Sequence, residues 1–181
     1  MIDSVDDQPI VPSFLENDRP SFLASHRALA ICSRELARLA VDVVRAAGAL
    51  CGSGVDDKPV ERVSPGRCIV QLGPVALTLT WLRSTIDTVA DGDLLVIGWR
   101  GSVAPRGEHL PERMTERASP LAPVALWEDV FSAAGTDEAS WIWRLKNSGT
   151  GGYSSTELAD LSVERLRLAY ENCRAAEKRI A

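Results

Sequence analysis

Tryptophan is the residue type whose distribution most suggests a binding surface in this chain. All five tryptophans fall in segments with the alternating pattern of β-strands. Arginine stacked on an indole ring can hold a planar ligand or single-stranded nucleic acid, and Arg83, Arg100 and Arg144 lie close to tryptophans in the sequence. Tryptophans on strands more often fill the core beneath covering helices. The five are Trp81, Trp99, Trp127, Trp141 and Trp143.

A polar segment after one of these strands carries the residues best suited to acid–base chemistry. It spans residues 100–117 and contains His109 among alternating arginines and glutamates. His109 and Glu112 are three residues apart, a spacing that would place two metal ligands on one helical turn. A structural zinc site needs further ligands, and the other histidine of the chain is the distant His26. Alternating charges are typical of a solvated surface, so we expect no metal ion and no other cofactor.

The four cysteines are poorly placed for nucleophilic catalysis. Cys32 and Cys173 fall on the apolar stripes of two predicted helices, and Cys68 falls in a predicted buried strand, where a thiol packs as a small hydrophobic group. Cys51 would stand at a helix C-terminus, whose dipole disfavours a thiolate. The sequence also lacks the Gly-x-Ser-x-Gly motif of a serine hydrolase. These patterns favour a protein that binds rather than one that catalyses.

A long helix is predicted over residues 21–50, with Ser21 or Ser25 as its cap. Its apolar residues recur every seven positions, with others between them, which is the pattern of a helix-packing seam. The seam could pack against the last helix of the same chain, or against its own copy across a two-fold axis. Its members are Leu29, Leu36, Leu39, Val43 and Leu50.

The middle of the chain has the pattern of consecutive strands. The clearest alternation lies in residues 75–82, where Val75, Leu77 and Leu79 share one face. Short connections favour an antiparallel meander, so we predict an α+β fold: an antiparallel sheet of about five or six strands covered by a long N-terminal helix and a long C-terminal helix. The predicted strands are residues 67–72, 75–82, 94–103, 124–131 and 141–146; residues 52–65 are predicted to be a loop, and residues 162–180 the last helix, capped by Ser162.

Composition and charge set the domain organisation and exclude some classes of function. With 181 residues, of which 45% are hydrophobic, the chain suits one domain at residues 21–181 and a flexible tail at residues 1–20. The net charge of −5 argues against nucleic-acid binding. No apolar run approaches the ~20 residues that span a bilayer, and the start of the chain lacks the basic residues of a secretory signal. We therefore expect a cytoplasmic protein that does not enter membranes.

Two functional hypotheses follow. The first is a non-enzymatic protein-interaction or regulatory module, which could be a dimer and which binds a protein partner or its own copy through the first helix. The alternative is a small-molecule-binding domain or enzyme with a pocket between the sheet and the helices. In that case Trp99, Trp141 and Trp143 would line the pocket, and Arg100 and His109 would make its polar contacts.

Overall fold

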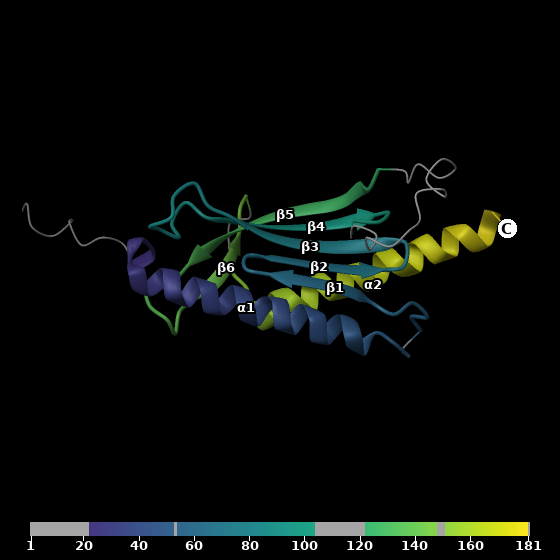
Figure 1. Cartoon of the computed structure of the whole chain (residues 1–181), viewed down its shortest axis with the longest axis horizontal. Helices are drawn as coiled ribbons and strands as arrows, with labels where there is room; N and C mark the ends of the chain where they lie inside the picture. The colour runs from purple at the N-terminus through teal and green to yellow at the C-terminus, as the bar shows by residue number, and fades with distance from the viewer. Residues whose placement is uncertain (1–21, 53, 104–121, 148–150, 181) are drawn as a thin grey trace, which may run out of the picture.

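The computed structural model describes residues 22–52, 54–103, 122–147 and 151–180. Within these ranges six strands form one antiparallel sheet, and each strand lies beside its neighbours in sequence (Figure 1). A long helix precedes the sheet and another follows it, so the predicted α+β fold is confirmed. The elements are a 3₁₀ turn, Phe22–Ala24; α1, His26–Ala49; β1, Val60–Ser64; β2, Arg67–Leu72; β3, Val75–Leu82; β4, Asp93–Arg100; β5, Val124–Ala134; β6, Ile142–Leu145; and α2, Ser155–Ile180.

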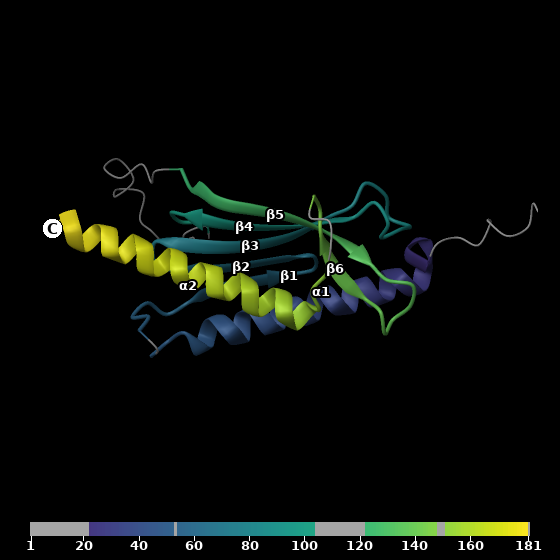
Figure 2. The same ribbon diagram turned by 180° about the vertical axis from the view of Figure 1, so that it is seen from behind.

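The two helices have different relations to the sheet. α2 lies across one face of it, whereas α1 lies along the edge formed by β1 and packs mainly on α2 (Figures 1 and 2). Val70 of β2, Leu77 of β3 and Leu166 of α2 are fully buried between these layers. The Ser25 hydroxyl caps α1 by accepting from the backbone N–H of Ala28 at 3.1 Å, as one of the two predicted caps.

The prediction of a loop over residues 52–65 is wrong for its last part, because Val60–Ser64 forms β1. This strand pairs with β2 in a register that runs from Val60 opposite Gln71 to Ser64 opposite Arg67. All five of its residues are exposed, so it lacks the alternation of buried and exposed residues that marks a half-buried strand. An edge strand of this kind leaves little trace in hydrophobic periodicity.

The predicted start of the last helix is also wrong, because α2 begins at Ser155 rather than at Ser162. Ser154 and Glu157 form a capping box: the Ser154 backbone N–H donates to the Glu157 carboxylate at 2.8 Å, and the Glu157 N–H donates to the Ser154 hydroxyl at 3.2 Å. The Ser154 hydroxyl also donates to the Glu157 carboxylate at 2.8 Å, and the bonds from the Ser154 N–H and hydroxyl lower the pKa of Glu157. The Ser162 hydroxyl instead donates to the carbonyl of Leu158 inside the helix at 2.6 Å.

Gly98 of β4 makes room for a tryptophan of the neighbouring strand. A Cβ atom at position 98 would overlap the Trp127 ring, and the pairing of β4 with β5 shifts register between Gly98 and Trp99. The Trp127 ring lies 4.8 Å from the Arg165 guanidinium of α2, which also forms an ion pair with Asp129. Because Gly98 has no side chain, the Trp127 ring of β5 can pack beside it and also contact Arg165 of α2.

We predict that Gly98→Ala lowers the free energy of unfolding by about 1–3 kcal/mol, because the added methyl overpacks against a ring that is held by Arg165. Gly48→Ala is the matched control. Position 48 lies in α1 with open space around it, so the same change should stabilise by about 0.5–1 kcal/mol. Chemical denaturation measures both, and an unchanged midpoint for Gly98→Ala would contradict the prediction.

A buried hydrogen-bond chain joins the last strand to both helices. The indole N–H of Trp143 donates to the Ser155 hydroxyl at 3.0 Å, and that hydroxyl donates to the Glu35 carboxylate of α1 at 2.8 Å. Two turns further along α1, and at the next residue of α2, the Thr156 hydroxyl donates to Asp42 at 2.9 Å. Carboxylates beside the N-terminus of α2 also face the positive end of its dipole. The middle of α1 is therefore bonded to the start of α2.

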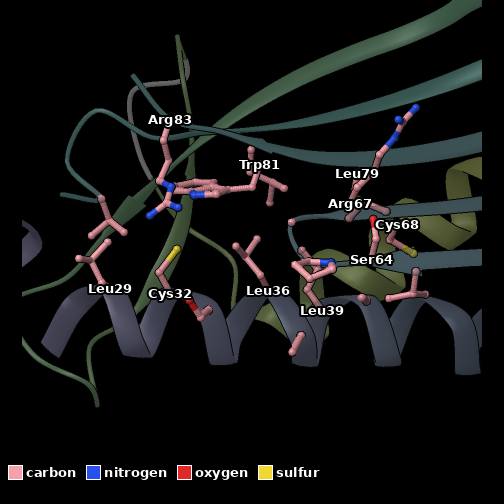
Figure 3. A pocket seen from close by; sticks show the side chains of 18 residues that line it. Leu29, Cys32, Leu36, Leu39, Ser64, Arg67, Cys68, Leu79, Trp81 and Arg83 are labelled. Atoms are coloured by element: carbon pink, nitrogen blue, oxygen red, sulfur yellow. The ribbon is translucent and has the colours of Figure 1, made fainter. Parts of the chain in front are cut away.

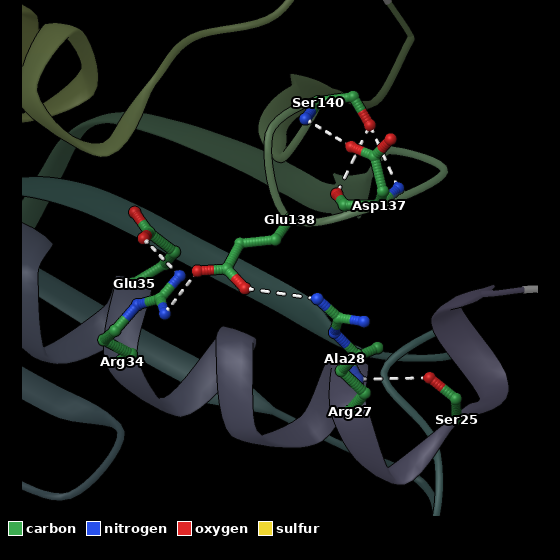
Figure 4. Close-up of polar contacts among 8 residues, drawn as sticks. All are labelled: Ser25, Arg27, Ala28, Arg34, Glu35, Asp137, Glu138 and Ser140. Atoms are coloured by element: carbon green, nitrogen blue, oxygen red, sulfur yellow. Dashed lines mark hydrogen bonds and ion pairs between the residues drawn. The ribbon is translucent and has the colours of Figure 1, made fainter.

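A second attachment holds the first half of α1 (Figure 4). Glu138, in the β5–β6 turn, accepts a hydrogen bond from Arg34 at 2.7 Å and lies 3.7 Å from Arg27. The turn is shaped by Asp137, whose carboxylate accepts from the Ser140 backbone N–H at 2.8 Å, and the bonds from Ser140 lower the pKa of Asp137. Exposed ion pairs stabilise by at most about 1 kcal/mol each, so this contact mainly orients α1.

Replacing Ser155 with alanine should cost about 1–3 kcal/mol of unfolding free energy, because the buried Trp143 indole N–H loses its acceptor and Glu35 loses a donor. Ser84→Ala, at an exposed position, is the control and should change stability by less than about 0.5 kcal/mol. Thermal and urea unfolding provide the measurement. Equal stabilities for the two variants would mean that the chain of bonds contributes nothing.

Candidate functional site

A cavity of about 600 Å³ lies between α1 and the strands that face it. Figure 3 shows Leu29, Cys32, Leu36 and Leu39 in a row along α1 below the cavity, with strand residues above it. The other walls come from the β1–β2 hairpin, from Leu79 and Trp81 of β3, and from Val89 and Leu94. Most of these side chains are apolar, so the cavity offers a hydrophobic surface with an open side.

The predicted seam of α1 is divided between the core and this cavity. Leu39 and Val43 are fully buried within the chain, and Leu39 also borders the cavity. Leu29 and Leu36 are only half-buried, since the cavity lies in front of them. Leu50, at the end of α1, packs partly against the core. Each seam residue of α1 therefore packs against the core of its own chain or borders the cavity.

One end of the cavity carries an aromatic ring and a cation. The Trp81 ring contacts the buried Trp143 edge to face, with centroids 5.8 Å apart, and its other parts border the cavity. Figure 3 shows the Arg83 guanidinium beside Trp81 and above Cys32, whereas Arg67, also at the rim, extends away from α1. Arg83 donates one hydrogen bond to the carbonyl of Ile86, at 3.2 Å.

Two buried thiols face the cavity, and their surroundings make them unreactive. Burial raises the pKa of Cys32 to about 12, although the charge of Arg83 opposes the shift. Burial likewise raises the pKa of Cys68 to about 11. Of the described residues, no three His, Cys, Asp or Glu side chains gather in a way that could hold a metal ion. The described lining therefore lacks a group suited to proton transfer or nucleophilic attack near neutral pH.

The tryptophans predicted to line a pocket are not brought together around one. Trp141 and Trp143 lie in the core with their rings edge to face at 5.7 Å. Trp99 lies on the opposite face of the sheet, where its indole N–H donates to the Thr78 hydroxyl at 2.9 Å. Alternation along the strands causes this separation, because Trp99 has the parity of Thr78 rather than that of Leu77.

The two polar residues predicted for the same pocket have different outcomes. Arg100 ends β4 and borders a separate, more open hollow of about 420 Å³ between β5 and α2. The exposed Leu126 and Leu168 form much of that hollow. His109 lies outside the described residues. Trp81 and Arg83, which were not part of the predicted pocket, border the cavity beside α1.

Comparison with protein-family models, with curated protein sequences and with solved structures finds no match to this chain. Neither of the described helices is long and apolar enough to cross a membrane. The geometry of the cavity is therefore the main evidence on function.

We predict that iodoacetamide at about pH 8 modifies the exposed Cys51 of the folded protein at least about a hundredfold faster than Cys32 or Cys68, because the alkylating species is the thiolate. Peptide mass spectrometry over a time course measures each rate. In denaturant the differences should disappear, which serves as the control. Fast modification of Cys32 in the folded protein would show that the thiol is accessible and ionised.

Proposed function

We propose that this protein is a small-molecule-binding domain whose ligand has an apolar body and occupies the cavity between α1 and the sheet. The observation that carries the proposal is the mostly apolar cavity of about 600 Å³ beside the buried core. Ligand sites are commonly concave, mostly apolar and about 300–1,000 Å³ in volume. Filling the cavity would remove water from apolar surface, which stabilises a complex by about 25 cal/mol per Å² of that surface.

Binding is favoured over catalysis by the groups that face the cavity. Of its described lining residues, the ionisable ones are two arginines and two cysteines. An arginine does not exchange protons at neutral pH, and the raised pKa values of the thiols keep them protonated. These residues can recognise a ligand, but they supply no general base.

The hypothesis of a protein-interaction module that acts through α1 has less support. Leu39 and Val43 of the proposed seam are fully buried within the chain, so neither is exposed on the surface for a partner helix. Leu29 and Leu36 border the cavity, which suits a small ligand better than a second helix of about 10 Å diameter, and Leu50 packs partly against the core.

Closing the open side of the cavity should abolish binding. Ser33 and Ala37 are exposed residues of α1 at its rim, so the variant Ser33→Trp/Ala37→Trp adds bulk there without overpacking the core. The probe is Nile red, a neutral dye whose fluorescence rises in apolar surroundings. We expect its Kd to increase by about tenfold or more in this variant.

The matched control is Ala30→Trp/Val41→Trp, which adds two tryptophans to exposed positions of α1 outside the cavity. It should bind Nile red as the original chain does, and thermal unfolding should show that both variants fold. Equal affinities in the three proteins, or an equal loss in both variants, would contradict the proposal. As an independent measurement, native mass spectrometry of protein purified from its own host would identify a retained small molecule by its mass.

A further inference from the structure

We infer that the ligand is an amphipathic carboxylate, a long apolar chain whose carboxylate is held by Arg83 at one end of the cavity. The inference rests on the proposed function, because it assigns a chemical class to the ligand of the same cavity. It is carried by the shape of the cavity, by the charges around it and by the unused donors of one side chain.

The cavity is elongated and has different chemistry at its two ends. It follows α1 from Leu29 to Ala40, a distance of about 16 Å at the helical rise per residue. Arg83 lies at the end near Leu29 and Cys32, whereas the other end holds Leu39 and Cys68 together with Ser64 and with Arg67, whose guanidinium extends away from α1 (Figure 3). A linear ligand would therefore place its polar group near Arg83 and its chain along α1.

The charges around the cavity select an anion. Its described lining contains two arginines and no acidic residue, although the whole chain has a net charge of −5. The second arginine, Arg67, extends away from the cavity, so Arg83 is the cation beside the space itself (Figure 3). An acidic protein that presents only positive charge at one hollow will attract an anion there rather than a cation.

Arg83 also keeps donors available for a ligand. No carboxylate of the described residues forms an ion pair with it, and one of its five N–H groups donates to Ile86. Its charge is felt within the cavity, because it opposes the rise that burial causes in the pKa of Cys32. A guanidinium with free donors beside an aromatic wall matches a carboxylate in geometry and charge.

The test is competition for bound Nile red by three compounds with the same chain, used below their micellar concentrations: dodecanoate, dodecanol and dodecyltrimethylammonium. We expect dodecanoate to displace Nile red at a concentration about tenfold lower than dodecanol, and the cation to be the weakest. Arg83→Gln should remove the advantage of dodecanoate and leave the affinity for dodecanol unchanged. Arg67→Gln is the matched control, because it removes the same charge from a side chain that points away, and it should preserve the advantage.

The outcomes separate this inference from the proposed function. If dodecanoate and dodecanol compete equally, or if Arg67→Gln acts as strongly as Arg83→Gln, the carboxylate assignment is overturned while apolar binding stands. If dodecyltrimethylammonium competes best, the cavity selects cations and the assignment is likewise overturned. If none of the three compounds displaces Nile red, both the carboxylate assignment and the proposed function fail.

Discussion

The hydrogen-bond chain from Trp143 through Ser155 to Glu35 is the contact on which the placement of both helices depends. It joins the last strand to the first residue of α2 and, across 120 positions of sequence, to the middle of α1. A buried donor without a partner is costly, so a packing of the helices that moved Ser155 away would leave the Trp143 indole N–H without its acceptor. The same ring has edge contacts with Trp81 and Trp141, which restrict its orientation. The aromatic core and the helix pair are therefore specified together.

The cavity follows from the way in which α1 is held. Glu35 and Asp42, seven residues apart, share the face of α1 that meets the start of α2, where short hydroxyl side chains bring the two helices close. Leu36 lies about 100° around the helix from Glu35, and so faces the strands instead. On that side α1 meets the sheet mainly at β2, and the exposed β1 does not close the gap. The open space is what remains when a helix is bonded to its neighbour rather than packed on the sheet.

Much of the fold could be predicted because buried faces of helices and strands place hydrophobic residues at regular intervals in the sequence. The alternation in β3 and the seven-residue spacing in α1 both arise from side chains that face the core, and both elements lie where they were predicted. The errors occur where burial is slight or where polar residues carry the signal. β1 has no buried residue, and the first turns of α2 are marked by the Ser154–Glu157 capping box rather than by an apolar stripe.

The candidate site was harder to predict, since a seam indicates which side chains of a helix turn inward but not how far away the opposing surface lies. One signal was nevertheless available in the pairs of tryptophan and arginine. Residues two apart on a strand share a face, whereas adjacent residues face opposite sides. Arg100 directly follows Trp99 and Arg144 directly follows Trp143, so neither arginine can accompany its tryptophan. Arg83 is two residues beyond Trp81, just after the end of β3, so this pair has the spacing that puts a cation and an indole on one side, where both border the cavity.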